Sequence, residues 1–288
     1  MRLSFAHAIA GLLLSFACTA QAATEPTTRP APTPIKASKI ILVGDSTTAV
    51  QGGWGPSFCA RHVTSFVACL NLARGGRSSY SYRAEGSWDI ALAEMATPGY
   101  QHTWVLLQFG HNDQPGKPGR STDLQTEFPA NLRRYVQQVR DAGATPVLVT
   151  PLTRRQFEDG QLKDDLAPWV EVVREVAAQM QVPLLDLNAR SRQLIQGMGP
   201  VLSMATAQRP PAPAQVVAAQ AGTSIDMAKG NVASEVDDRA GSSRQPMAQP
   251  KLSFDYTHLG PEGADLFAAI IADELAQQVP ALRPLLYP

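Results

Sequence analysis

The sequence lacks a net charge, an apolar segment long enough to cross a bilayer, and more than a few cysteines. Its 288 residues include 25 Lys and Arg and 25 Asp and Glu, so no overall field attracts nucleic acid or an anionic membrane surface. Three cysteines without a neighbouring pair of histidines do not suggest a metal site. The apolar stretch at residues 5–17 is shorter than the roughly 20 residues of a spanning helix. We therefore expect no nucleic-acid partner, no stable membrane association and no metal.

The N-terminus has the pattern of an export signal. Arg2 supplies a positive charge, residues 5–17 are mostly apolar, and Ala20-Gln21-Ala22 fits a small-x-small cleavage site. We predict a signal peptide over residues 1–22 and a secreted or periplasmic protein. An uncleaved anchor is the alternative, and a lipoprotein at Cys18 is disfavoured by the poor match of the residues before it.

Two cysteines remain after such a cleavage, Cys59 and Cys69. An even number of cysteines in an oxidising compartment predicts one disulfide between them. Two buried thiols are the alternative.

A Pro- and Thr-rich leader over residues 23–38 precedes one predicted domain over residues 39–288. Continuous apolar runs in this domain are typical of buried parallel strands. The runs are residues 40–43, 66–72, 104–109, 146–149 and 182–187.

Helical patterns alternate with these runs, at residues 126–142, 165–180 and 262–278. Alternating strands and helices predict a parallel sheet covered on both faces. Residues 203–250 are rich in Ala, Gln, Ser and Pro without periodicity. We predict a disordered or loosely ordered insertion there, for which a lid over the site is the functional alternative.

Short polar motifs follow several of the predicted strands. Ser46 comes directly after the first one, within Gly44-Asp45-Ser46, and ligands of open α/β sheets bind at the carboxyl ends of strands. A serine hydroxyl needs a base to take its proton. His258 can be that base, and Asp255, three residues earlier, can fix its tautomer and stabilise the imidazolium.

The same edge of the sheet offers donors for an oxyanion. The backbone N–H groups of Ser46 and Gly76 and the side-chain amide of Asn112 are suited to this role. Each motif alone has an ordinary interpretation as a turn or a helix cap. His111 is the alternative base, although His258 has the better-placed carboxylate. The ordered set predicts a serine esterase site.

The chain resembles the GDSL-type SGNH hydrolases, whose name-giving residues match Ser46, Gly76, Asn112 and His258. The segments at residues 71–79, 85–86 and 108–113 resemble the rhamnogalacturonan acetylesterase branch more narrowly. The resemblance covers residues 39–200 and 254–288. It implies a three-layer α/β/α sandwich with a five-stranded parallel sheet, flavodoxin-like, and no cofactor. It also implies removal of acetyl groups from pectic polysaccharide.

Two segments depart from that pattern, the 203–250 insertion and the Pro/Gly loop at residues 114–119. Arginines near the site loops fit a groove for uronate carboxylates, although ordinary surface charge is the alternative. We expect Arg77 to brace its turn. Arg154 and Arg155 follow the fourth strand, and we predict that they contact substrate.

These observations predict an exported, monomeric carbohydrate O-acetylesterase acting on rhamnogalacturonan. An acetylxylan or broad short-chain esterase is the first alternative. A carbohydrate-binding protein that has lost the chemistry is the second, and the complete set of site residues argues against it.

Overall fold

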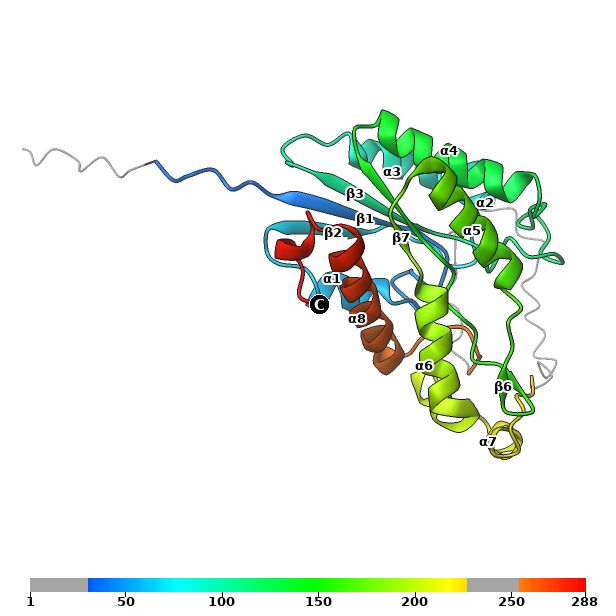
Figure 1. The fold of residues 1–288 in the computed structure, drawn as a ribbon. Helices are drawn as coiled ribbons and strands as arrows, with labels where there is room; N and C mark the ends of the chain where they lie inside the picture. The colour runs from blue at the N-terminus through cyan, green and yellow to red at the C-terminus, as the bar shows by residue number, and fades with distance from the viewer. Residues whose placement is uncertain (1–30, 227–253) are drawn as a thin grey trace, which may run out of the picture. The chain divides into compact units, whose positions relative to one another are not determined.

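The computed structural model describes residues 31–226 and 254–288. Its centre is a parallel sheet with strand order β2-β1-β3-β4-β7 (Figure 1). The strands are β1 (Ser38–Gly44), β2 (Val67–Asn71), β3 (Thr103–Gln108), β4 (Thr145–Val149) and β7 (Leu184–Leu185). The predicted five-stranded parallel sheet is confirmed.

The apolar run in β1 supplies both faces of the sheet. Ile40 and Leu42 belong to one hydrophobic cluster, whereas Ile41 and Val43 belong to another. Side chains alternate between the faces of a strand, so a sheet covered on both sides needs apolar residues at every position. This requirement explains why the strand reads as a continuous apolar run.

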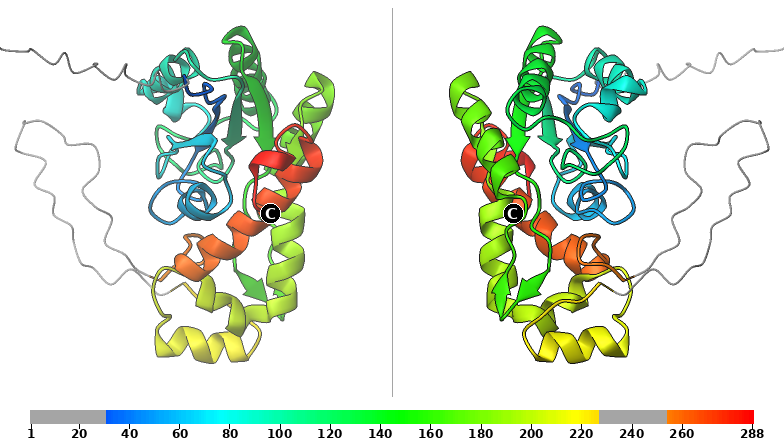
Figure 2. Two further views of the ribbon diagram at one scale, coloured as in Figure 1. Left: turned by 90° about the vertical axis from the view of Figure 1, so that its left-hand side faces the viewer. Right: turned by 90° about the vertical axis from the view of Figure 1, so that its right-hand side faces the viewer.

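Helices cover each face and complete three layers (Figures 1 and 2). Apolar residues of α1 (Gly55–Arg61), α6 (Leu187–Leu202) and α8 (Pro261–Gln278) join the cluster that contains Ile40. Apolar residues of α2 (Ser81–Ala84), α3 (Ser87–Met95), α4 (Glu127–Asp141) and α5 (Ala167–Met180) join the other. No helix in the described part of the chain has the length and apolarity that crossing a bilayer would need.

The fifth strand is shorter than predicted. The apolar run at residues 182–187 contributes only Leu184–Leu185 to the sheet, and α6 begins at Leu187. The side chain of Asp186 ends the strand, because it accepts a hydrogen bond from the backbone N–H of Ala189 and caps the new helix. Helix α6 itself was not predicted.

The predicted insertion is wrong in its first half. Residues 203–226 contain the 3₁₀ helix η1 (Ser203–Thr206) and α7 (Pro213–Gln220). The backbone of Gly222 pairs with Gly160, beside the two-stranded hairpin of β5 (Phe157–Glu158) and β6 (Gln161–Leu162). Composition alone did not reveal this regular structure, because the residues that pair with it come from a distant part of the chain. Residues 227–250 lie outside the described residues, as do the predicted signal peptide and residues 23–30 of the leader.

Cys59 and Cys69, for which the sequence predicts a disulfide, lie next to each other. Cys59 in α1 and Cys69 in β2 are paired, with their sulfurs 1.98 Å apart. The link ties the first helix to the edge strand of the sheet. Export of the protein, and with it an oxidising surrounding for this disulfide, stays a prediction.

A second 3₁₀ helix, η2 (Arg283–Leu285), follows α8. Val63, just after α1, forms an antiparallel bridge with Leu286. The C-terminal end is thereby attached next to the first helix.

Candidate active site

Ser46 is the second residue of the loop that leaves β1. The preceding Gly44 lies so close to β3 that a Cβ atom there would be 2.6 Å from the backbone oxygen of Gln108. The buried carboxylate of Asp45 accepts hydrogen bonds from the N–H and the hydroxyl of Thr47, each at 2.8 Å. These contacts fold the chain back sharply after the strand, so that the Ser46 side chain reaches the cavity.

Neighbouring strands brace this loop from below. The side-chain oxygen of Gln108, at the end of β3, accepts from the hydroxyl of Thr48 and, at 2.8 Å, from the indole N–H of Trp54. Asn71, at the end of β2, donates to the backbone oxygen of Thr48 at 2.9 Å. All of these contacts come from the sheet, so the position of the serine is tied to the sheet.

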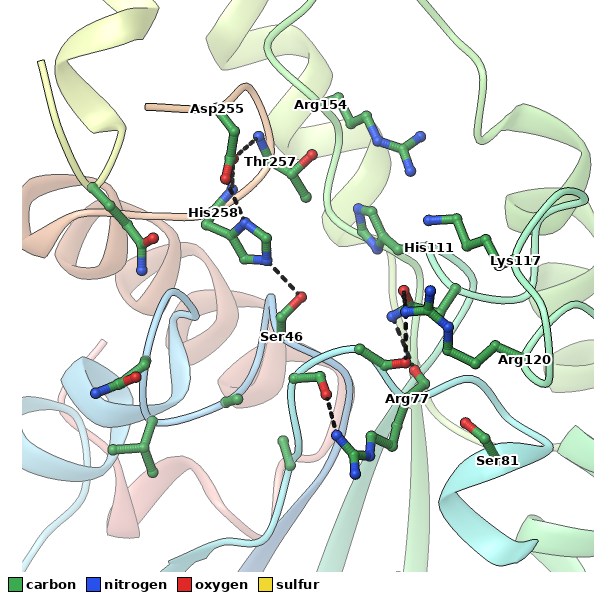
Figure 3. A pocket seen from close by; sticks show the side chains of 18 of the residues that line it. Ser46, Arg77, Ser81, His111, Lys117, Arg120, Arg154, Asp255, Thr257 and His258 are labelled. Carbon is green, nitrogen blue, oxygen red and sulfur yellow. Dashed lines mark hydrogen bonds and ion pairs between the residues drawn. The ribbon is translucent and has the colours of Figure 1, made fainter. Parts of the chain in front are cut away.

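His258 connects Ser46 with Asp255 (Figure 3). Its Nε2 lies 2.9 Å from the Ser46 hydroxyl oxygen, and its Nδ1 lies 2.7 Å from Asp255 Oδ2. The other oxygen of Asp255 accepts from the backbone N–H groups of Thr257 and His258, both at 2.7 Å. Burial opposes ionisation of Asp255, but its hydrogen bonds and the neighbouring His258 outweigh it and hold the pKa of the carboxyl below its ordinary value.

Arg155 holds the loop that carries this pair. The guanidinium donates to the backbone oxygens of Asp255 at 3.0 Å, Thr257 at 3.2 Å and His258 at 2.8 Å. The residue is only 1% exposed. Burial lowers the pKa of Arg155 to about 10, and Asp255 acts in the opposite direction, so the group is charged at neutral pH. The prediction that Arg155 contacts substrate is therefore wrong, because its side chain points into the protein rather than into the cavity.

The proposed oxyanion donors come from three loops and all line the same cavity. Gly76 has a φ of +76°, a conformation that glycine adopts without strain. The side-chain nitrogen of Asn112 donates to the backbone oxygen of Arg77 at 3.1 Å, and its oxygen lies 3.5 Å from a guanidinium nitrogen of Arg120. This arrangement fixes the orientation of the amide and leaves its second N–H for a ligand.

His111 lies beside the nucleophile loop with a different partner. Its Nδ1 is 3.4 Å from Asp45 Oδ2, and the side chain is buried. Burial works against the charge on Asp45, but His111 and the hydrogen bonds from Thr47 hold the pKa of this carboxyl below its ordinary value. Among the described residues, His258 is the histidine in hydrogen-bond contact with Ser46. The geometry therefore favours His258 over His111 as the base.

Asp113 links two of the site loops, a role the sequence did not suggest. It accepts from the backbone N–H of Ser79 at 3.0 Å and the Ser79 hydroxyl at 2.6 Å, and from the Thr122 hydroxyl at 3.1 Å. Burial raises the pKa of Asp113 to about 7 in spite of these bonds. The residue thereby ties the Asn112 loop to the Gly76 loop.

These loops surround an open cavity of about 930 Å³, a size suited to a small ligand or part of a polymer. Arg77 forms a two-pronged ion pair with Glu85 and also donates to the backbone oxygen of Gly75 at 2.8 Å, which agrees with the bracing role expected of it. Arg154 lines the cavity. The sequence did not single out three other lining residues, Lys117, Arg120 and Gln208. No cluster of three or more potential metal ligands occurs in residues 31–226 and 254–288.

A Ser–His–Asp arrangement beside the carboxyl end of a parallel strand is typical of serine hydrolases. The GDSL-like Lipase/Acylhydrolase family matches residues 42–266, and the chain belongs to this family. It is an esterase, and the resemblance found in its motifs is confirmed.

Two proteins of Bacillus subtilis (strain 168) are similar in sequence. The chain is 35% identical over 162 residues to the probable rhamnogalacturonan acetylesterase YesY, which covers 54% of this chain and 72% of the relative. It is also 35% identical over 173 residues to the rhamnogalacturonan acetylesterase RhgT, covering 57% of this chain and 71% of that one.

Two solved structures share the fold. The B. subtilis protein YxiM superposes with a TM-score of 0.59 at 21% identity, over 85% of this chain and 58% of that chain. The acetylxylan esterase Axe2 from Geobacillus stearothermophilus superposes with a TM-score of 0.50 at 16% identity, over 85% and 95% of the two chains. At these identities the similarity concerns the fold alone.

Proposed function

We propose that the protein is a carbohydrate acetylesterase that removes acetyl groups from rhamnogalacturonan with Ser46 as nucleophile. The observation that carries the mechanism is the contact chain through His258, at 2.9 Å to Ser46 and 2.7 Å to Asp255, at the wall of an open cavity. The two B. subtilis relatives, RhgT named as a rhamnogalacturonan acetylesterase and YesY as a probable one, support the choice of substrate.

The first half of the reaction transfers the acetyl group to the enzyme. Ser46 Oγ attacks the acetyl carbonyl while its proton moves to His258 Nε2, and Asp255 stabilises the imidazolium. The carbonyl oxygen becomes an oxyanion, held by the N–H groups of Ser46 and Gly76 and the amide of Asn112. The carbon–oxygen bond to the sugar then breaks, and His258 returns the proton to the departing sugar oxygen.

The second half releases acetate. A water molecule loses a proton to His258 and attacks the acetyl-serine, which forms a second oxyanion in the same place. Collapse of this intermediate breaks the bond to Ser46 Oγ, which takes back the proton. The loop held by Arg155 keeps the imidazole in position through both halves, because its contacts are to backbone rather than to the reacting groups.

The proposal includes export to the periplasm or the medium. The signal-like residues 1–22 support export, and so does the pairing of Cys59 with Cys69, since disulfides persist in oxidising compartments. A polymer substrate would also be met outside the cytoplasm.

Acetate release tests the proposal directly. Purified protein is given acetylated rhamnogalacturonan, acetylated xylan and an aryl acetate, with Ser46→Ala as the control that removes the nucleophile. We expect the fastest release from rhamnogalacturonan and a loss on the order of 10⁶ in turnover for the variant. Equal rates on the two polymers would favour a broad esterase. Absence of hydrolysis on all three substrates would favour a carbohydrate-binding protein.

A further inference from the structure

Two basic side chains in the cavity wall have no carboxylate within ion-pair distance among the described residues. The other charged residues there are paired, Arg77 with Glu85, Arg154 with Asp165 outside the cavity, and His258 with Asp255. No carboxylate of the described residues lies within ion-pair distance of Lys117 or Arg120, although both line the cavity. The described cavity wall therefore carries an excess of positive charge at one place.

The loop that presents these two cations is held in a defined shape. The Ser121 hydroxyl donates to the backbone oxygen of Gln114 at 2.8 Å and accepts from the backbone N–H of Lys117 at 2.9 Å. The backbone N–H groups of Arg120 and Ser121 both donate to the Lys117 oxygen, at 3.0 and 2.9 Å. The backbone of this loop is already held in one shape, so little conformational entropy is lost there when a ligand binds. This favours a specific binding role for the two cations over ordinary surface charge.

The cations repel one another in the absence of a ligand. Burial lowers the pKa of Lys117, and the positive charges of Arg154 and Arg120 lower it further, while Asp45 and Asp165 act in the opposite direction. Lys117 and Arg120, in a partly desolvated wall, are stabilised when an anion enters between them.

The position of the pair relates it to the reaction centre. A guanidinium nitrogen of Arg120 lies 3.3 Å from the backbone oxygen of Gly76, next to the proposed oxyanion site. Figure 3 shows Lys117 and Arg120 on the side of the cavity away from Asp255 and His258. A sugar whose acetyl carbonyl sits at Ser46 would therefore have its neighbouring groups near these cations.

We propose that Lys117 and Arg120 form a subsite for a sugar carboxylate, so that the enzyme recognises a uronate next to the acetyl group it removes. The guanidinium can hold a carboxylate with two parallel hydrogen bonds, and the lysine adds a point charge. The positive charge of Arg154 adds to the attraction for an anion, while its terminal nitrogens are held by Asp165 and Gln114. The subsite deepens the proposed function and rests on it for the identity of the polymer.

Inhibition of aryl-acetate hydrolysis tests the subsite without requiring the polymer to react. The inhibitors are a rhamnogalacturonan oligosaccharide without acetyl groups and the same oligosaccharide with its carboxyl groups reduced to alcohols. In the unaltered protein we expect the carboxylate form to bind at least about tenfold more tightly at low ionic strength, because hydrogen bonds to charged groups exceed those to neutral ones. Added salt should narrow this difference.

Variants at residue 117 assign the preference to the loop. Lys117→Gln should reduce the ratio of the two inhibition constants by roughly tenfold, and Lys117→Arg should restore most of it. Lys163→Gln removes an equal charge from a side chain that pairs with Glu158 and is 49% exposed, and it should leave the ratio unchanged. A Lys117→Gln protein with the original ratio, or an unaltered protein that does not distinguish the two inhibitors, would overturn the subsite.

The two proposals can fail separately. Carboxylate-selective inhibition without acetate release from rhamnogalacturonan would leave the subsite intact and refute the polymer assignment. Acetate release from rhamnogalacturonan without carboxylate selectivity would refute the subsite and leave the polymer assignment intact.

Discussion

The two loops that meet at the Ser46–His258 contact are held in different ways. The nucleophile loop, residues 45–54, leaves β1 and is braced by Gln108 and Asn71 at the ends of the two neighbouring strands. The base loop, residues 254–260, contains no strand of the sheet. Arg155 holds much of this loop, because its buried guanidinium binds three of the loop's backbone oxygens and its backbone N–H donates to the oxygen of Tyr256 at 2.8 Å.

The difference concerns how many independent contacts fix each reacting group. Several bonds from two strands hold the serine, so the loss of one leaves others in place. Further contacts do reach the base loop, since the N–H of Leu259 donates to Gly52 and that of Gly260 donates to Thr206, both at 2.9 Å. These lie beyond His258, and before it the Tyr256 hydroxyl donates to the backbone oxygen of Ile225 at 3.0 Å. The backbone oxygens of Asp255, Thr257 and His258 all accept from the Arg155 guanidinium. We infer that the base loop is the more vulnerable of the two.

The largest effect should come from removing the base itself. His258→Ala should reduce turnover almost as strongly as loss of the nucleophile, on the order of 10⁶, because Ser46 then has no proton acceptor. His111→Ala should be milder, since this side chain contacts Asp45 rather than Ser46. Turnover of an aryl acetate by both variants checks the order. If His111→Ala is the more damaging change in a folded protein, His258 is not the base.

Replacing the guanidinium should be the next largest change. Arg155→Met leaves three backbone oxygens of half-buried residues without their guanidinium donor, at up to about 1–3 kcal/mol for each group that stays unsatisfied. We expect the free energy of unfolding to fall by about 3 kcal/mol or more, and labelling of Ser46 by a phosphonate to slow strongly in the protein that remains folded. Arg133→Met, at an exposed residue of α4, is the matched control for both measurements.

The corresponding change in the nucleophile loop should be smaller. Gln108→Leu removes the acceptor for Thr48 and Trp54 but leaves the bonds from Asn71 and within the Asp45 turn. We expect a loss of about 1–3 kcal/mol in the free energy of unfolding and a smaller slowing of phosphonate labelling than in Arg155→Met. If Gln108→Leu slows labelling more than Arg155→Met does, the base loop is not the weaker of the two.

Acid should weaken both loops, through one carboxylate in each. Asp45 and Asp255 both have a pKa below the ordinary value in the folded protein. The folded state therefore releases these protons more readily than the unfolded chain, and the stability they supply is present above the unfolded pKa, near pH 4, and is lost as the pH falls through the folded values. We expect the larger share from Asp45, which is fully buried, because the Asp255 side chain is 37% exposed and partly screened.

The measurement is the pH dependence of unfolding in Asp45→Asn and Asp255→Asn, each compared with the unaltered protein. Asp113 acts in the opposite direction, since its raised pKa, about 7, makes stability fall as the pH rises from about 4 toward 7. Subtracting the curve of the unaltered protein removes this common contribution. If the free energy of unfolding becomes less dependent on acidic pH in Asp255→Asn than in Asp45→Asn, Asp45 does not supply the larger share.

The sequence revealed the parts of the site whose residues are determined locally. Ser46 follows an apolar run that can only be a buried strand or helix segment, and Asp255 and His258 are close enough in the chain to be read as a pair. The sheet was predictable for the same reason, since each strand carries its own apolar run. The family motifs then indicated which of these loops supply the nucleophile, the oxyanion donors and the base.

The direction of the two adjacent arginines was not predictable. Arg154 and Arg155 follow the same strand, yet one lines the cavity and the other turns inward to backbone oxygens about 100 residues away in the chain. Neither propensity nor spacing distinguishes them, because the deciding partners are supplied by tertiary structure. The same holds for Lys117 and Arg120, whose loop shape comes from hydrogen bonds among its own Ser and backbone groups.

The regular structure in residues 203–226 limits where this enzyme can be shortened or fused to another domain. Gln208 lines the cavity, Ala207 bridges to Leu259 beside His258, and the backbone oxygen of Thr206 accepts from the N–H of Gly260. Excision of the whole Ala- and Pro-rich stretch as if it were a linker would open the wall next to His258. A designed deletion or domain graft therefore has to keep the polypeptide intact at least as far as Asp226.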